Sequence, residues 1–168
     1  FAPMVPYFTS GQLHSFPTLL PGHFRTSIAA GILQYCQGSR AWRNVGLQKF
    51  RTFQDYQALW REYDFVFCGD DGQGDLLAGQ MMIQESEARD PSEVGPRLLA
   101  VLIHQVLPEN ERPAQVIYEE QGSEQDDAWA ERWFKRGLVL HKTYIGAALA
   151  LHRYNQSLMP LDTVAQIS

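Results

Sequence analysis

The stretch that decides the fold is DFVFCGDDGQGDLLAGQMM, Asp64 to Met82. It opens with a short apolar run rich in β-formers, which predicts a buried strand that ends at Gly69. Three aspartates then lie among three glycines, and apolar residues at helical spacing follow. The pattern therefore predicts a strand, a tight acidic turn and a helix. In an open α/β sheet, ligands bind at the carboxyl ends of the strands, so the turn is a candidate site.

The segments around this stretch continue the alternation of helix and strand. Helical spacing or strand-like apolar runs occupy the following segments in order: a helix at Arg25–Gln37, a helix at Leu47–Tyr63, a strand within residues 97–106, a strand at 113–120, a helix at 124–137, then strand, turn and helix over 138–156, and a short helix at 160–167. This order predicts an α/β fold with a mostly parallel sheet. Residues 1–24 are predicted to be a loop-rich opening segment of a single domain, 1–168.

Composition excludes several classes of protein. The 168 residues are 45% apolar and carry a net charge of −5, which is typical of a soluble globular domain without a basic nucleic-acid-binding stripe. The apolar runs are shorter than the roughly 20 residues of a transmembrane helix, so no membrane span is predicted. Cys36 and Cys68 have no metal-type partner spacing, and two lone cysteines favour an intracellular, reducing compartment.

The acidic turn allows two interpretations. Asp70, Asp71 and Asp75 would repel one another unless they are solvated, hydrogen-bonded or bound to a cation. Mg²⁺ prefers hard oxygen ligands, often one or two carboxylates with phosphate and water, so a divalent-metal site is one interpretation. The other is an Asx turn in which Asp71 or Asp75 caps the following helix.

The same stretch resembles the fourth motif of the haloacid dehalogenase superfamily, a strand that ends in G-D-x-x-x-x-D, here Gly69, Asp70 and Asp75. Three segments in order also resemble the catalytic domain of the phosphatidate phosphatases first described from an actin-patch protein. They are SFPTLLPG at Ser15–Gly22, QKFRTFQDY with the GDDGQGD strand, and KTYIGAALALH at Lys142–His152. The resemblance implies a Rossmann-like haloacid dehalogenase core and a Mg²⁺-dependent phosphatase acting on phosphatidate or another phosphomonoester.

The resemblance also gives Lys49 a role. The superfamily carries a basic residue on the helix before the fourth-motif strand, and Lys49 matches that position. There its ammonium group would neutralise the transferring phosphoryl group, whereas without the resemblance it reads as a solvated lysine near a helix start. His104 follows a predicted strand and either approaches a substrate or serves as a structural histidine.

The family's nucleophile motif, D-x-D-x-[TS], does not occur in this sequence. The chain therefore resembles the carboxyl half of the phosphatase core, without its amino-terminal strands, and we expect no turnover from it alone. Two interpretations follow: a missing upstream segment completes an active enzyme, or the chain is an accessory or structural subunit with a degenerate phosphatase fold. In the second, another protein chain covers the open sheet edge. Four tryptophans are possible anchors for it, although core packing is the default for most of them: Trp42, Trp60, Trp129 and Trp133.

Overall fold

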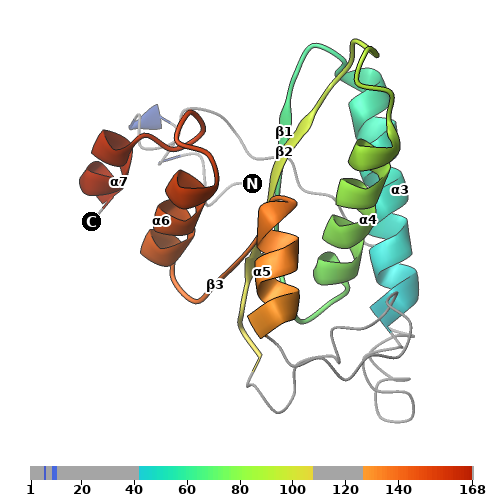
Figure 1. Ribbon diagram of the computed structural model, residues 1–168. Helices are drawn as coiled ribbons and strands as arrows, with labels where there is room; N and C mark the ends of the chain where they lie inside the picture. Colours follow the sequence, from blue (N-terminus) through green and yellow to red (C-terminus); the bar gives the residue numbers. More distant parts are fainter. Residues whose placement is uncertain (1–5, 7–8, 11–41, 108–126, 168) are drawn as a thin grey trace.

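The computed structural model describes Pro6, Thr9, Ser10 and residues 42–107 and 127–167 (Figure 1). The predicted helix at Arg25–Gln37 and the predicted strand at 113–120 lie outside the described residues, as does most of the opening segment 1–24. Statements about the fold below concern the described ranges.

Helices and strands alternate along the described chain. The elements are α3 (Arg43–Leu59), β1 (Phe65–Asp70), α4 (Asp75–Ala88), β2 (Leu98–His104), α5 (Asp127–Lys135), β3 (Leu138–His141), α6 (Tyr144–Tyr154) and α7 (Leu161–Ile167). The predicted α/β class is confirmed, and the arrangement is compatible with a Rossmann-like fold. No helix in the described ranges has the length and apolar character that crossing a membrane requires.

The three strands form one parallel sheet in the order β1-β2-β3. Their register aligns Asp70 with His104 and His104 with His141, so the last residues of all three strands lie side by side. These carboxyl ends meet at one edge of the sheet, toward the bottom of Figure 1. The acidic turn follows β1 at this edge, which is where the sequence predicted it.

One face of the sheet is covered by α3, α4 and α5. The buried core on this face consists of Phe53, Phe67, Leu76, Ala78, Met82, Ile83, Val101, Ile103, Trp129, Trp133 and Leu138. Trp129 and Trp133 are only 4% and 1% exposed, so they belong to the core, as expected by default for most of the tryptophans, and not to a partner-binding surface. They hold α5 against the sheet because burial of large aromatic side chains is strongly favourable. Trp60, at the end of α3, is 43% exposed.

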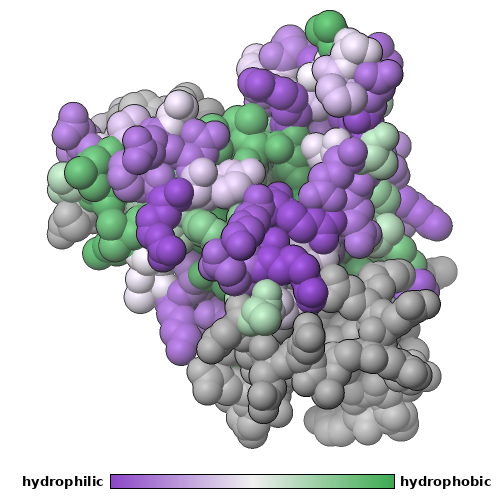
Figure 2. Space-filling view, viewed as in Figure 1, coloured by the Kyte–Doolittle hydropathy of each residue, from purple (hydrophilic) through white to green (hydrophobic). Residues whose placement is uncertain are grey.

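The other face is covered unevenly. Helix α6 packs on β3, and α7 lies beside α6. Toward β1 the cover is thinner, since Val66 is 44% exposed and Cys68 is also exposed. Figure 2 shows apolar surface in the hollow between α6 and the upper parts of β1 and β2. Among the described strands, β1 lies at the end of the sheet, so its outer edge carries no partner there.

Helix α3 begins at Arg43, earlier than the predicted start at Leu47. The reason is a close backbone contact that sequence periodicity does not reveal. A Cβ atom at Gly46 would lie 2.7 Å from the carbonyl oxygen of Gly74, so only glycine lets the first turn of α3 approach the acidic turn. Gly46 is buried in the first turn of α3, and Arg43 and Asn44, which the sequence placed in a loop, belong to the helix.

Candidate functional site

The acidic turn at the carboxyl edge is shaped by Gly74. This residue is the N-cap of α4 and has a φ of +82°, a conformation that residues with side chains rarely adopt. A Cβ atom at Gly74 would lie 2.7 Å from the carbonyl oxygen of Trp42, just before α3. The turn and the start of α3 are therefore in direct backbone contact, which brings Lys49 to the site.

Lys49 and the two outer aspartates converge at this turn. The Lys49 Nζ atom donates a hydrogen bond to Asp75 Oδ1 and forms an ion pair with it. The two side chains are only 14% and 11% exposed. Asp75 Oδ2 accepts a hydrogen bond from the backbone N–H of Asp70 at 3.2 Å. The structure thus brings Lys49 and Asp75 together from neighbouring helices, and Asp70 contacts the pair through its backbone N–H group.

Asp75 lies in an environment that disfavours its ionised form. Burial raises the pKa of the Asp75 carboxyl, and the nearby Asp70 carboxylate adds to that shift. The hydrogen bond and the charge of Lys49 act in the opposite direction. A Cβ atom at Gly69 would lie 2.5 Å from Asp75 Cβ, so the glycine before Asp70 makes room for this side chain. Asp75 therefore depends on Lys49 for its charge.

Asp71 connects two strands. It is 5% exposed, and its Oδ1 atom accepts hydrogen bonds from the backbone N–H groups of Val106 at 2.8 Å and Leu107 at 3.0 Å. Its own backbone N–H donates to the carbonyl oxygen of His104 at 3.1 Å. Asp71 thus fastens the acidic turn to the segment that leaves β2. The N-cap of α4 receives no side-chain hydrogen bond, so Asp71 does not cap that helix.

Asp70 forms an Asx turn, whereas the sequence predicted an Asx turn in which Asp71 or Asp75 caps the following helix. Its Oδ1 atom accepts a hydrogen bond from the backbone N–H of Gly72 at 2.8 Å. The side chain is half-buried, and each carboxylate oxygen can accept more than one bond. Among the described residues, no group of three or more potential ligand side chains is arranged to hold a metal ion. Mg²⁺ is often held by one or two carboxylates with phosphate and water, and Asp70 with Asp75 is a set of that size.

Two histidines lie beside the aspartates. The rings of His104 and His141, which end β2 and β3, stack with centroids 5.2 Å apart and planes 3° apart. His141 is 7% exposed, and burial, followed by the neighbouring His104, lowers the pKa of its imidazole. Sequence analysis assigned no role to His141. The sequence could have indicated His141, because both histidines end strands that are neighbours in a parallel sheet.

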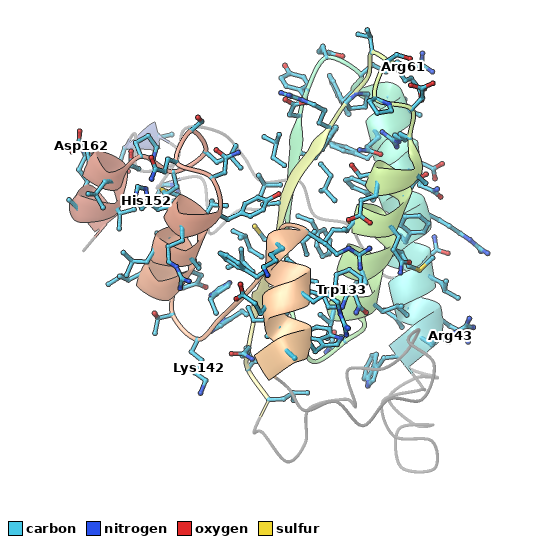
Figure 3. All side chains as sticks on the ribbon, in the orientation of Figure 1. Arg43, Arg61, Trp133, Lys142, His152 and Asp162 are labelled. Carbon is cyan, nitrogen blue, oxygen red and sulfur yellow. The ribbon has the colours of Figure 1, made fainter. Side chains whose placement is uncertain are left out.

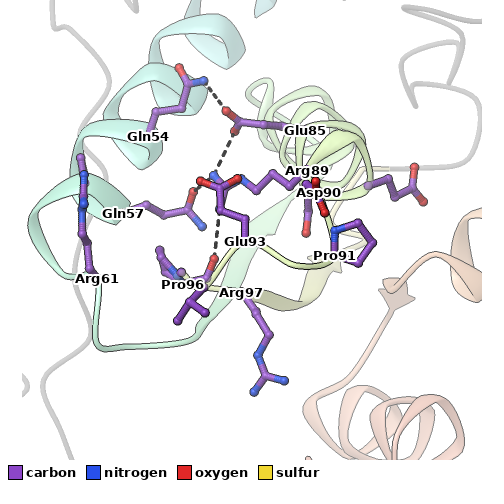
Figure 4. A pocket seen from close by; sticks show the side chains of 15 residues that line it. Gln54, Gln57, Arg61, Glu85, Arg89, Asp90, Pro91, Glu93, Pro96 and Arg97 are labelled. Atoms are coloured by element: carbon purple, nitrogen blue, oxygen red, sulfur yellow. Dashed lines mark hydrogen bonds and ion pairs between the residues drawn. The ribbon is translucent and has the colours of Figure 1, made fainter.

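A cavity lies at the amino-terminal end of the strands, opposite the acidic turn (Figure 4). This cleft of about 650 Å³ lies between the ends of α3 and α4 and the segment before β2. Arg89 donates to Gln57 Oε1 at 2.8 Å and to the carbonyl oxygen of Pro96 at 3.0 Å, and Gln54 donates to Glu85 at 2.8 Å. Its polar side chains are thus largely bonded to one another.

The described elements define an α/β protein built on a parallel sheet, with its charged turn at the edge where such proteins bind ligands. Comparisons of the chain with known protein families, with curated proteins and with solved structures find no match. The function of the chain is therefore inferred from the residues of the site.

Proposed function

We propose that this chain is the carboxyl half of a Mg²⁺-dependent phosphatase domain of the haloacid dehalogenase type, with a phosphomonoester as its substrate. The observation that carries the proposal is the pairing of Lys49 with Asp75 beside Asp70, at the carboxyl end of β1. A nearly buried lysine at the edge where α/β proteins bind ligands is suited to an anionic substrate. The resemblance of Gly69–Asp75 to the family's fourth motif supports the same assignment.

Each residue of the turn has a distinct role in this proposal. Asp70, the more accessible carboxylate, is the main protein ligand of Mg²⁺, and Asp75 shares the ion through its remaining acceptor capacity. When bound, the ion would neutralise charge on the phosphoryl oxygens. The Lys49 ammonium lies where it can do the same from the other side, and Asp75 orients it. Asp71 keeps the β2 exit at a fixed distance from the turn.

The nucleophile has to come from outside the matched motifs, because the sequence contains no D-x-D-x-[TS]. Parallel strands are joined by right-handed crossovers, and α3 covers the same face of the sheet as α4. A strand that precedes α3 would therefore lie on the β1 side of the sheet. That position is next to the open edge of β1 and to Asp70, so an upstream segment of the same polypeptide supports an active enzyme. The family resemblance implies phosphatidate as the particular phosphomonoester, and its assignment as a substrate here rests on that resemblance.

A second candidate is an accessory subunit without catalysis. The open edge of β1 and the exposed Val66 and Trp60 favour it, because unpaired strands and exposed apolar side chains need cover from a neighbour. The sequence upstream of Phe1 distinguishes the candidates. A D-x-D-x-[TS] strand there supports the enzyme, whereas a separate partner chain on the β1 edge, burying more than roughly 1,000 Å², supports the subunit.

The cation site can be tested by titrating this chain with MgCl₂ while recording backbone amide resonances. We expect weak, millimolar binding with shifts confined to residues 69–75, because half a ligand set binds the ion weakly. Asp70→Asn should abolish the shifts, whereas the matched control Asp90→Asn, in the loop at the other end of the sheet, should leave them unchanged. Tight stoichiometric binding by this chain, or shifts centred elsewhere, would contradict the proposal.

Catalysis can be tested with p-nitrophenyl phosphate. The chain 1–168 alone should not hydrolyse it, whereas a longer polypeptide that adds a D-x-D-x-[TS] strand should. In that longer protein, Lys49→Met should lower kcat by about 10²–10³-fold, the usual effect of removing one charge-stabilising group. Hydrolysis by residues 1–168 alone would show that the nucleophile has been misplaced.

A further inference from the structure

Three aromatic rings gather at the carboxyl edge, beside the aspartate turn. We call His104, His141 and Tyr144 the ring platform. The two imidazoles are stacked, and the Tyr144 ring lies 5.8 Å from His104 and 6.3 Å from His141, tilted by 40° and 42°. Tyr144 is 77% exposed, so it contributes little to the core. Packing alone therefore does not account for an aromatic residue at this position.

The platform is held in place by hydrogen bonds between the strand ends. His104 Nε2 lies 3.2 Å from the carbonyl oxygen of Lys142, and the backbone N–H of Gln105 donates to the carbonyl oxygen of His141 at 2.8 Å. Thr143 caps α6 by accepting a hydrogen bond from the backbone N–H of Gly146 at 3.0 Å, which fixes Tyr144 as the first residue of the helix. Lys142, labelled in Figure 3, marks this corner of the molecule. These bonds fix the backbone positions from which the three rings project.

The platform continues the row that begins at the aspartate turn. Asp70, His104 and His141 are register partners on neighbouring parallel strands, so their side chains point to the same face of the sheet. Neighbouring strands are roughly 4.8 Å apart, which places the platform about 5–10 Å from Asp70. This is about the separation between a phosphoryl group and the ring of a small aryl or nucleoside phosphate.

From this juxtaposition we propose that the ring platform is a subsite that stacks with a planar aromatic group carried by the phosphoryl ligand, either an aryl ring or a nucleobase. The inference rests on the proposed function for the position of the phosphoryl group. Aromatic side chains bind such rings through their faces, and the exposed Tyr144 ring beside the two stacked imidazoles offers such a face. A substrate class is thereby assigned to the site: aryl or nucleoside monophosphates, in preference to esters of flexible alcohols such as the phosphatidate that the family resemblance implies.

The test compares three probes on this chain by equilibrium dialysis and by backbone amide resonances. They are adenosine 5′-monophosphate, glycerol phosphate and adenosine. We expect adenosine 5′-monophosphate to bind at least about tenfold more tightly than glycerol phosphate, as the usual strength of base stacking implies, and to shift the amides of Tyr144 and His104. Tyr144→Ala should remove this preference and leave glycerol phosphate binding unchanged, whereas Tyr144→Phe should retain it.

Tyr63→Ala is the matched control, because Tyr63 is also an exposed tyrosine, 57% exposed, but lies at the opposite end of the sheet. It should change none of the three affinities. Equal binding of adenosine 5′-monophosphate and glycerol phosphate by the unmodified chain would overturn the proposal. So would an equal loss of both in Tyr144→Ala when the thermal unfolding temperature is unaltered.

The outcomes separate this proposal from the proposed function. If adenosine binds at Tyr144 and its phosphate adds no affinity, the platform stands and the phosphoryl site at Lys49 fails. If both phosphates bind, lose affinity in Lys49→Met, and show no preference for the ring, the phosphoryl site stands and the platform fails. Loss of ring binding in Tyr144→Ala together with loss of phosphate binding in Lys49→Met supports both.

Discussion

At the amino end of the sheet, the polar side chains around the cleft bond to one another: Arg89 to Gln57, and Gln54 to Glu85. At the carboxyl end, three aspartates lie within one turn, and a single lysine, Lys49, forms an ion pair with one of them. Both ends are polar and both are built by the same pairs of helices and strands. The difference among the described residues is in the hydrogen-bond partners: side chains of the cleft bond to other side chains, whereas each aspartate of the turn accepts hydrogen bonds from backbone N–H groups.

We infer from this comparison that the carboxyl end is the better suited of the two to a charged ligand. A cleft whose hydrogen bonds are largely made within the protein has little to gain from a charged ligand, even when its volume is large. Clustered carboxylates gain from a cation, and Lys49 adds a place for an anion. The predictions below test this asymmetry, from the largest expected effect to the smallest.

Lys49→Met should have the largest effect. It leaves the buried Asp75 without its cation, and losing one partner of a buried pair costs about 3–5 kcal/mol of stability. Burial already raises the pKa of Asp75 and Lys49 opposes the rise, so the pKa of Asp75 increases further in the variant. A pKa raised in the folded state favours folding at low pH, and that advantage is lost as pH rises through it. The deficit measured by urea denaturation should therefore grow as pH rises from the ordinary pKa of an aspartate through the raised pKa of Asp75.

Lys135→Met provides the control for this prediction. Lys135 lies on α5, its side chain is 73% exposed, and its ion pair with Glu131 spans 3.9 Å on the helix surface. Its stability should differ little from that of the unmodified chain at any pH in this range, because surface pairs contribute little. A Lys49→Met deficit that is independent of pH would argue against a buried, charged Asp75.

Arg89→Ala tests the amino end of the sheet. The substitution leaves the buried Gln57 side chain and the carbonyl oxygen of Pro96 without their donor. An unsatisfied buried group costs about 1–3 kcal/mol, which urea denaturation measures directly. Arg61→Ala, at the exposed rim of the same cleft, should change stability by less than about 0.5 kcal/mol. If both variants behave alike, the cleft is not held together by the Arg89 bonds.

The smallest effect concerns Asp64 and Arg97, which pair at the surface before β1 and β2. The hydrogen bonds from Arg97 lower the pKa of Asp64 below its ordinary value. A lowered pKa stabilises the fold above the ordinary value, and this contribution disappears as pH falls through the folded value. Side-chain carboxyl resonances should show Asp64 titrating at low pH, and Arg97→Ala or high salt should return it toward its ordinary value. An unchanged pKa in that variant would contradict the assignment.

Much of the fold follows from local pattern. The run that ends at Gly69 predicts β1, and the acidic residues with a terminal glycine predict α5, which stops before Gly137 at a φ of +98°. These features depend on neighbours in the chain, so a sequence contains them directly. The start of α3 was not predictable in this way, because it depends on a contact between Gly46 and a residue in a distant turn.

The features of the candidate site also divide into those that local sequence predicts and those that depend on distant contacts. The gathering of Lys49, Asp70 and Asp75 followed from the strand, the turn and the family resemblance. The bonds from Asp71 to the β2 exit and the stack of His104 on His141 did not, because both require the register between strands. Register is a tertiary property, and a single sequence specifies it only through contacts that are not local.

The backbone contact between Gly46 and Gly74 has a consequence for how this protein can change over generations. Neither position has space for a Cβ atom, so a substitution at one is not compensated by trimming a side chain at the other. Both should therefore stay glycine in any descendant that keeps α3 docked on the turn, even where surrounding residues drift. The two glycines together are therefore a sequence marker of the contact between α3 and the acidic turn.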